Sequence, residues 1–203
     1  MRGISLALLC ALLSGCAWFR PAPVSPPLTD KAKAWAEHQA AVVALESFQI
    51  EGRVAIKRGT EGGSVKLRWQ QRGFATDLRL MAPLAQGSFH LERNADGVAL
   101  TGPDGQRHRA ADLEALMQSH LQWSFPVEGA RYWVRGVPDP KAKIDHLTLD
   151  AAGHLSALAQ SGWQISVLAY REVAGYQLPA KLLLVAGNVQ LRLVIDQWEL
   201  TRS

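Results

Sequence analysis

The chain has 203 residues, of which 48% are hydrophobic and 20% are charged, and its 22 basic and 18 acidic side chains give a formal net charge of +4. This length suits one domain with a sizeable core. The basic residues are scattered rather than gathered in runs. Such a mild and dispersed charge argues against a protein that binds nucleic acid.

Residues 1–15 predict a secretory signal peptide that is removed. Arg2 supplies a positive charge and is followed by an apolar run from Ile4 to Leu13. This run is too short to cross a bilayer, because a spanning helix needs about 20 apolar residues. A short apolar segment behind a basic residue is typical of a cleaved signal.

The apolar run ends in a lipobox, Leu13-Ser14-Gly15-Cys16. We therefore expect Cys16 to become the first residue of the mature protein and to carry a covalent N-acyl diacylglycerol group on its sulfur and amine. The alternative is an ordinary signal peptide with an incidental cysteine. The other cysteine, Cys10, leaves with the signal, so the body is expected to hold no disulfide and no thiolate ligand for a metal.

Residues 16–29 are expected to form a spacer between the membrane and a domain that covers residues 30–203. Pro21, Pro23, Pro26 and Pro27 forbid a helix interior and favour an extended chain. Bacterial lipoproteins with Asp after the lipidated cysteine are commonly kept at the inner membrane. By resemblance to that sorting class, Ala17 predicts the periplasmic face of the outer membrane.

The first part of the domain reads as one helix followed by short strands. Thr29 or Asp30 caps a helix predicted to end near Leu45, with His38 packed at the edge of its apolar face. The hydrophobic period then changes to two, which is typical of half-solvated strands. These strands are expected around residues 48–57, 65–69, 74–80, 89–91, 98–100 and, more weakly, around Arg107.

A second helical segment is predicted at about residues 111–121, and a shorter one from Pro126 to near Trp133. Strands resume at residues 145–149, 155–160, 163–170, 178–185 and 189–200. The fold class is therefore mainly β with a few helices. About eleven antiparallel strands are expected to form an incomplete barrel, with the helices covering its apolar concave side. Periodicity leaves open whether that side is filled or hollow.

The sequence offers no support for catalysis. Its six histidines show no metal-binding helical spacing, and it has neither a G-x-S-x-G elbow nor a phosphate-binding glycine loop. We therefore expect no enzyme activity, no cofactor and no resident metal.

Strand phase and helix position predict the lining of an apolar cavity, if one exists. A register slip of one residue would invert the contribution of a strand. The predicted lining residues are Trp69, Leu78, Leu80, Phe89, Leu91, Trp133 and Ile165.

The segment from Met81 to Gly87 resists a purely structural explanation. It contains Pro83 and Gly87, as a hairpin loop should, but it is otherwise apolar where loops are normally polar. Leu84 either contacts lipid or an apolar partner, or folds back onto the core. The sequence pattern alone leaves both interpretations open.

The order of several short motifs resembles the LolB family of outer-membrane lipoprotein receptors. Ala85 stands where that family often has Gly, and Gln122 replaces its usual Gly before Trp123. The motifs that carry the resemblance are the lipobox, Trp35-x-x-His38, Gly52-Arg53, Trp69-Gln70-Gln71, Pro83-Leu84, Asp104-Gly105, Tyr132-Trp133-Val134-x-Gly136-x-Pro138, Gly153, Gln160-x-Gly162-Trp163, Leu178-Pro179 and Trp198.

The resemblance implies a lipid-anchored monomer that accepts lipoproteins from the periplasmic carrier LolA. It implies that an apolar cavity holds the acyl chains of this cargo and that Pro83 and Leu84 form a loop that helps to insert it into outer-membrane lipid. A scaffolding lipoprotein with a solidly packed barrel is the alternative from another class. A lipid-modifying hydrolase is a third, and the missing nucleophile argues against it.

Overall fold

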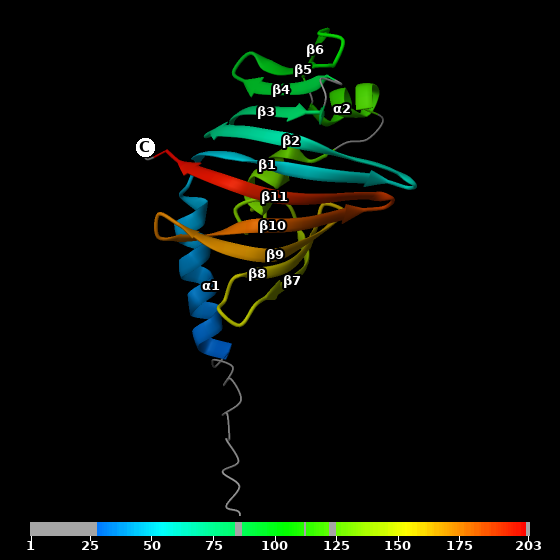
Figure 1. Ribbon diagram of the computed structural model, residues 1–203. Coiled ribbons are helices and arrows are strands. Elements are labelled where there is room, and N and C mark those ends of the chain that lie inside the picture. The colour runs from blue at the N-terminus through cyan, green and yellow to red at the C-terminus, as the bar shows by residue number, and fades with distance from the viewer. Residues whose placement is uncertain (1–27, 84–86, 112, 122–124, 202–203) are drawn as a thin grey trace, which may run out of the picture.

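The computed structural model describes residues 28–83, 87–111, 113–121 and 125–201 of the chain. In this part of the chain eleven antiparallel strands form one open sheet, and three helices accompany it (Figure 1). The predicted fold class, an incomplete antiparallel barrel of about eleven strands, is therefore confirmed.

The sheet consists of two meanders that meet side by side. The first contains β1 Ser47–Arg58, β2 Glu61–Arg72, β3 Ala75–Met81, β4 Ser88–Asn94, β5 Gly97–Thr101 and β6 Arg107–Ala110. The second contains β7 Ile144–Leu149, β8 Leu155–Gln160, β9 Trp163–Val173, β10 Tyr176–Ala186 and β11 Val189–Leu200. Strand β1 pairs with β11, so β6 and β7 are the two edges of the sheet.

The alternation of side chains decides which face of the sheet is inside. Along β1, Phe48, Ile50 and Val54 are buried, whereas Arg53 and Ala55 are exposed. The twist of so long a sheet curls it toward a barrel, and the apolar side chains gather on the concave side. The core therefore lies between that side and the helices that connect the two meanders.

Helices α2 Leu113–Leu121 and α3 Val127–Trp133 stand between β6 and β7 in the chain. They lie behind the sheet in the view of Figure 1. Buried residues of both helices belong to the core, with Leu116 and Met117 on α2 and Ala130 and Trp133 on α3. A connection of this kind lets the second meander return beside the first.

Helix α1, Leu28–Val43, lies at one end of the sheet, close to the turn between β7 and β8. Lys31 Nζ donates to Leu149 O at 2.8 Å, and a Cβ on Gly153 would meet Ala34 Cβ at 2.9 Å. Gly153, with φ of +87°, therefore allows the turn to approach the helix closely. Among the described residues, the helices are all too short or too polar to cross a membrane.

One predicted strand boundary is wrong. Phe74 was assigned to a strand from residue 74 to 80, but β3 begins at Ala75 and Phe74 follows Gly73 in a turn. Gly73 has φ of +56°, a conformation that suits glycine in tight turns. Phe74 is 52% exposed, and the guanidinium of Arg93 lies 5.9 Å from the centre of its ring.

Candidate functional site

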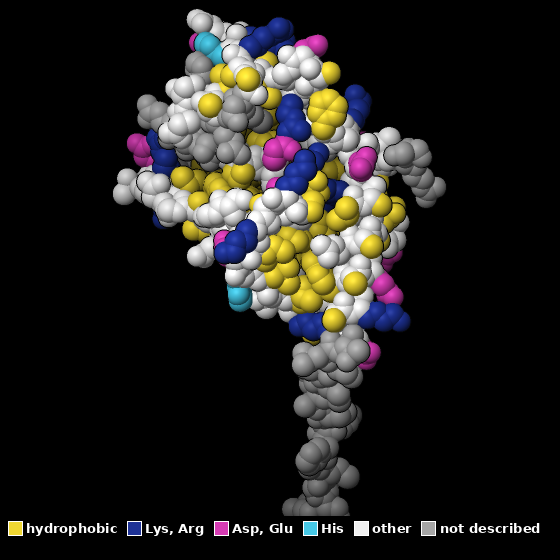
Figure 2. Space-filling model, turned by 180° about the vertical axis from the view of Figure 1, so that it is seen from behind, with side chains coloured by type: hydrophobic (Ala, Val, Ile, Leu, Met, Phe, Trp, Pro, Cys, Tyr) yellow, Lys and Arg dark blue, Asp and Glu magenta, His cyan; other side chains and the backbone are white. Residues whose placement is uncertain are grey.

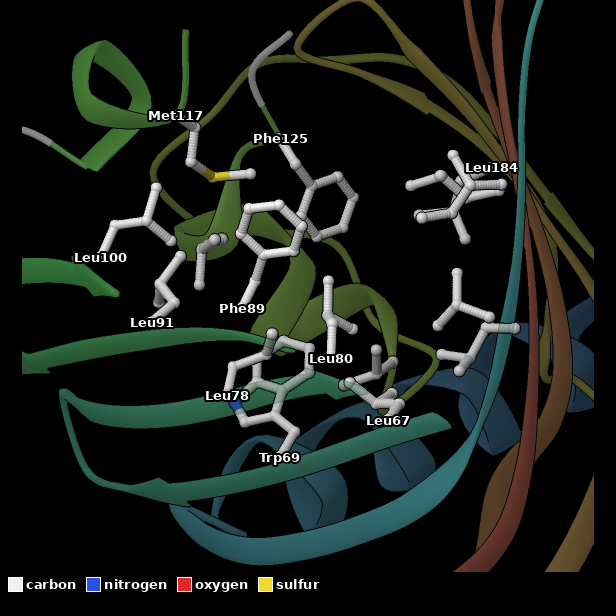
Figure 3. Close-up of a pocket in the computed structure, with 16 residues that line it drawn as sticks. Leu67, Trp69, Leu78, Leu80, Phe89, Leu91, Leu100, Met117, Phe125 and Leu184 are labelled. Carbon is white, nitrogen blue, oxygen red and sulfur yellow. The ribbon is translucent and has the colours of Figure 1, made fainter. Parts of the chain in front are cut away.

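An apolar cavity lies between the concave side of the sheet and the segment that carries α2 and α3. Its volume is about 80 Å³, and the described side chains that form its wall are all apolar. Strands β1 to β5, β10 and β11 contribute to this wall, whereas β6 to β9 do not. Figure 3 shows labelled side chains from β2 to β5, α2 and β10 pointing toward this common space.

Two rows of paired side chains build the wall on the first meander. Trp69 on β2 pairs with Leu78 on β3, which pairs with Leu91 on β4 and then with Leu100 on β5. The adjacent row consists of Leu67, Leu80 and Phe89 on the same strands. Directly paired residues point to the same face of a sheet, so each row forms a continuous apolar strip. The sequence prediction placed Trp69, Leu78, Leu80, Phe89 and Leu91 on this face, and all five line the cavity.

The second meander and β1 supply the opposite part of the wall. Ile56 pairs with Leu191 on β11, which pairs with Leu184 on β10, while Val54 pairs with Leu193. The helical side contributes Met117 from α2, together with Phe125, Val127 and Val134.

Trp69 lines the cavity without exposing its polar atom there. The indole Nε1 donates to Gln71 Oε1 at 3.0 Å, and the same oxygen accepts from Thr76 Oγ1 at 3.0 Å. Gln71 Nε2 in turn donates to Gly73 O at 2.8 Å. The hydrogen-bonding capacity of the indole is therefore met inside the protein, and the ring adds only apolar surface to the wall.

Trp133 was predicted to line the cavity, but the structure places it elsewhere. Its indole Nε1 donates to Gln160 Oε1 at 2.8 Å, and the side chain is fully buried. Gln160 also accepts from Asp139 N at 2.9 Å and donates to the carbonyls of Asp139 and Ala142. This polar network holds the ring against β8, outside the cavity wall.

Ile165 was also predicted in the lining and is likewise outside it. The predicted inward orientation of Ile165 on β9 is correct, because its side chain is only 1% exposed. It pairs with Leu184 on β10, however, and Leu184 marks the edge of the cavity. Phe125 packs edge to face against Trp163 on β9, with their ring centres 5.4 Å apart. This part of the interior is therefore filled.

Three other predicted site residues concern the anchor and the loop. Cys16 and Leu84 lie outside the described residues. Pro83 is exposed at the end of the described segment that follows β3. Across the loop, Ala82 N donates to Gly87 O at 3.1 Å, which closes its base as a hairpin.

The wall also contains residues that were not singled out from the sequence. Val54, Ile56, Leu67 and Leu100 follow the same inward alternation as their neighbours. The pattern therefore contains the signal for the inner face. It does not indicate how far along a strand the packed interior gives way to a cavity.

A cluster of ligand-type side chains lies on the other face of the first meander. One ligand atom from each of Asp77, His90 and Glu92 falls within 4.8 Å of the others. Arg79 Nε lies 3.2 Å from Asp77, and Arg107 Nη2 lies 2.9 Å from Glu92. The two guanidinium groups already supply positive charge to these carboxylates, so the arrangement is an ion-pair network on a solvated face.

Hydrophobic side chains are also visible at the surface of the molecule. Figure 2 shows the molecule from the side opposite to that of Figure 1, with hydrophobic side chains lying between scattered charged ones. Exposed apolar patches of this kind are typical of surfaces that meet a partner or lipid.

The open antiparallel sheet with helices over its concave side is a known architecture. It is shared with the crystal structure of a putative outer membrane lipoprotein-sorting protein domain from Vibrio parahaemolyticus. The two align with a TM-score of 0.54 over 86% of this chain and 94% of that one, at 11% sequence identity. At so low an identity the likeness shows the fold alone.

Sequence comparison shows the family. The model of the family described as outer membrane lipoprotein LolB matches residues 46–198. The outer-membrane lipoprotein LolB of Nitrosococcus oceani is 39% identical over 189 residues, covering 93% of this chain and 92% of that protein. That of Stutzerimonas stutzeri is 36% identical over 200 residues, covering 98% and 96%. The chain therefore belongs to the LolB family of outer-membrane lipoproteins, whose role is lipoprotein localisation and not catalysis.

Proposed function

We propose that the protein is a lipid-anchored receptor that accepts lipoproteins from the periplasmic carrier LolA. It holds their acyl chains in the apolar cavity and passes them into the outer membrane, to which Cys16 anchors it through an N-acyl diacylglycerol group. Cys16 remains a site predicted from the lipobox. The single observation that carries the proposal is the cavity, whose wall is formed by apolar side chains of seven strands and the helical segment.

An acyl chain needs shielding from water and little else. Burying hydrocarbon is favourable by about 0.8 kcal/mol per methylene group, so a chain of about sixteen carbons is worth on the order of 12 kcal/mol. A wall without exposed polar atoms provides this shielding by contact alone. Transfer then needs only an affinity for the chain that rises from carrier to receptor to bilayer.

The volume of the cavity is smaller than that of a pocket that encloses a whole ligand. Its volume of about 80 Å³ compares with roughly 300 to 1,000 Å³ for typical ligand pockets. Met117 and Phe125 form its helical side, and their side chains occupy space between the sheet and the helices. We propose that this side yields at α2 when a chain enters, because the sheet is tied by continuous hydrogen-bonded pairs, whereas Leu116 and Met117 of α2 pack against the core through apolar side chains.

Binding of palmitate to a soluble form of the protein tests the proposal. In a Cys16→Ala protein, Val134→Phe adds a ring to the cavity wall, whereas Val43→Phe adds it at an exposed helix end. We expect Val134→Phe to weaken binding about tenfold, which corresponds to the loss of about two buried methylene groups. Val43→Phe is expected to leave the affinity unchanged.

Native mass spectrometry after incubation with lipoprotein-loaded LolA provides the second readout. The expected species is the soluble body with one lipoprotein bound. A body that takes up neither palmitate nor lipoprotein would favour the scaffolding alternative.

A further inference from the structure

Four exposed basic side chains stand close together on the outward face of the sheet, the face turned toward the viewer in Figure 1. Within the part of the chain that the structure describes, none of the four forms an ion pair or a side-chain hydrogen bond. We call them the cationic patch, and its members are Lys57 on β1, Lys66 on β2, Lys181 on β10 and Arg192 on β11.

Strand pairing places two members of the patch in one row across four strands. Lys66 pairs with Arg53 on β1, and Arg53 pairs with Val194 on β11. Val194 in turn pairs with Lys181 on β10. Directly paired residues share a face and adjacent strands lie about 5 Å apart, so this row spans about 15 Å from β2 to β10.

The other two members lie in the next rows, toward the tips of the hairpins. Arg192 pairs with Ala55, two residues after Arg53 on β1, and Lys57 follows two residues later. Successive rows are about 7 Å apart, a distance that long basic side chains cover. Ala55 pairs with Ser64 on its other side, and these short side chains leave the charged groups uncovered.

The acidic side chains around the patch are already engaged with arginines. On β1, β2 and β3 every acidic side chain pairs with an arginine, as does Asp196 on β11, with N–O distances of 3.1 to 3.6 Å. The remaining acid of these strands, Glu199, lies at the opposite end of β11 from Arg192. The patch therefore remains as uncompensated positive charge. The ion pairs are Arg53–Asp196, Arg58–Glu61, Arg68–Glu51 and Arg79–Asp77.

The patch borders the base of the loop between β3 and β4. Lys66 pairs with Met81, the last residue of β3, and the side chain of Met81 is 37% exposed. Pro83 follows two residues later and is also exposed. Strand β3 ends on the side of the sheet where the β1–β2 and β10–β11 hairpins turn (Figure 1). Exposed basic and exposed apolar side chains therefore adjoin on this part of the surface.

We infer that the cationic patch docks the body onto anionic phospholipid headgroups and so brings the loop between β3 and β4 to the membrane. This inference rests on the proposed function, for which it names the lipid surface that receives the cargo. A membrane offers anionic headgroups with hydrocarbon beneath them, which matches basic side chains beside apolar ones. An acidic protein surface would match the charge alone. The relatives of this chain are outer-membrane lipoproteins, so a membrane surface is within reach.

The expected strength suits a reversible contact. Each basic residue close to an anionic membrane strengthens binding about fivefold, so four together supply up to several hundredfold. This attraction falls off within the Debye length of about 8 Å at physiological ionic strength. It therefore acts only when this face is turned to the membrane, and it orients the body without holding it permanently.

Sedimentation with vesicles of phosphatidylethanolamine and phosphatidylglycerol tests the inference. In the Cys16→Ala protein, the double variant Lys66→Gln with Arg192→Gln removes two charges of the patch. The control, Arg72→Gln with Lys141→Gln, removes two exposed charges that lie elsewhere. We expect the first double variant to bind at least about tenfold more weakly than the Cys16→Ala protein, and the control to change binding less than about twofold. Vesicles of phosphatidylcholine should bind all three proteins weakly and equally.

The remaining outcomes separate this inference from the proposed function. Palmitate binding reports the proposed function and should be equal in the two double variants, as should the melting temperature. Equal vesicle binding by both double variants, or equal binding of the Cys16→Ala protein to anionic and neutral vesicles, would overturn the inference and leave the proposed function intact. Failure of the Cys16→Ala protein to bind palmitate would count against the proposed function itself.

An acidic protein partner is distinguished by a separate measurement. Both double variants are incubated with lipoprotein-loaded LolA, and uptake of the lipoprotein is followed by native mass spectrometry. We expect equal uptake, because the patch acts on the membrane and not on the carrier. Reduced uptake together with unchanged vesicle binding in the Lys66→Gln and Arg192→Gln protein would assign the patch to the carrier and overturn the inference.

Discussion

Gly52 lies where the pairing of β1 with β11 is irregular, between Glu51 and Gly52. A Cβ at this position would lie 2.2 Å from Val194 O, an atom of the neighbouring backbone. Gly52-Arg53 is one of the motifs by which the sequence resembles its family. The structure supplies its physical reason, because only a residue without a side chain lets the strands approach this closely.

Replacing Gly52 with Ala should lower the free energy of unfolding by about 2 to 4 kcal/mol, because backbone atoms must separate to admit the methyl group. Gly63→Ala in the adjacent strand is the matched control. A Cβ at Gly63 meets nothing within 4 Å, so this change should cost less than about 0.5 kcal/mol. Urea unfolding of the soluble protein measures both, and equal effects would show that the contact at Val194 does not matter.

The sequence pattern predicts that His38 packs at the edge of an apolar helix face, but it does not predict the protonation state of His38. Its ring packs against those of His154 and Tyr170, with ring centres 4.8 Å and 6.3 Å away. Burial, and after it the neighbouring His154, lower the pKa of His38 from 6.5 to about 4, although Asp150 acts in the opposite direction. His38 is therefore neutral in the folded protein at neutral pH.

This pKa predicts a loss of stability in weak acid. The unfolded chain takes up a proton on His38 near pH 6.5, whereas the folded chain resists protonation until about pH 4. The stabilisation is thus complete above pH 6.5 and is lost as the pH falls toward 4. Because the site is only half buried, we expect the free energy of unfolding to fall by about 1 kcal/mol between pH 7.5 and pH 5.

Urea unfolding at these two pH values checks the assignment to His38. The difference in the free energy of unfolding between pH 7.5 and pH 5 should be smaller in His38→Gln, by the amount that His38 contributes. The exposed His146 provides the control, and His146→Gln should retain the full difference. If His38→Gln behaves like His146→Gln, the acid sensitivity belongs to another group.

At the scale of elements, helix α1 depends on a side chain that is far away in the sequence. Its last turn contains no basic residue. Arg135 instead donates from Nη1 to the carbonyls of Val42, Val43 and Leu45, the last at 2.7 Å. The carbonyls of Val42 and Val43 lie in the last turn, where a helix runs out of i+4 donors, and Leu45 follows the helix. Burial lowers the pKa of Arg135 to about 10, so it stays charged at neutral pH.

Arg135→Met should therefore loosen the end of α1 and cost about 2 to 4 kcal/mol, because buried carbonyls lose their donors. Hydrogen exchange of the amides in residues 40–45 should become faster than in the unmodified protein. Arg53→Met is the comparison, since Arg53 is 62% exposed in its ion pair with Asp196 and contributes little. Unchanged exchange in Arg135→Met would contradict this capping role.

The loop between β3 and β4 carries the prediction made for Leu84 from the sequence. If Leu84 enters lipid, Leu84→Glu should leave the melting temperature and cargo acceptance unchanged while delivery to the membrane slows, because a carboxylate resists transfer into hydrocarbon. Transfer of lipoprotein from the loaded protein to outer-membrane vesicles measures this. Leu84→Ile should remain near normal. A large fall in melting temperature for Leu84→Glu would instead indicate a core residue.

At the scale of the whole molecule, the lipobox predicts a lipid anchor at Cys16 that is separate from the folded body. Cys16→Ala with a cleavable signal should yield a folded protein that fractionates with the periplasmic contents in high salt, because the proposed anchor of two or three acyl chains is then lost. Cys10→Ala changes the other cysteine of the chain and should leave the protein with the membranes. If the Cys16→Ala protein also stays there, the anchor assignment is wrong.

Hydrophobic periodicity predicts the strands, their inward faces and the helices to within a few residues, because it follows from local backbone geometry. It therefore identified five residues of the cavity wall, from Trp69 to Leu91. Only the tertiary structure decided where the interior is hollow. Trp133 and Ile165 point inward as expected, yet one is held by Gln160 and the other lies beyond Leu184, at the edge of the cavity. Hollowness depends on how far the helices stand from each strand, and no local pattern of residues encodes that distance.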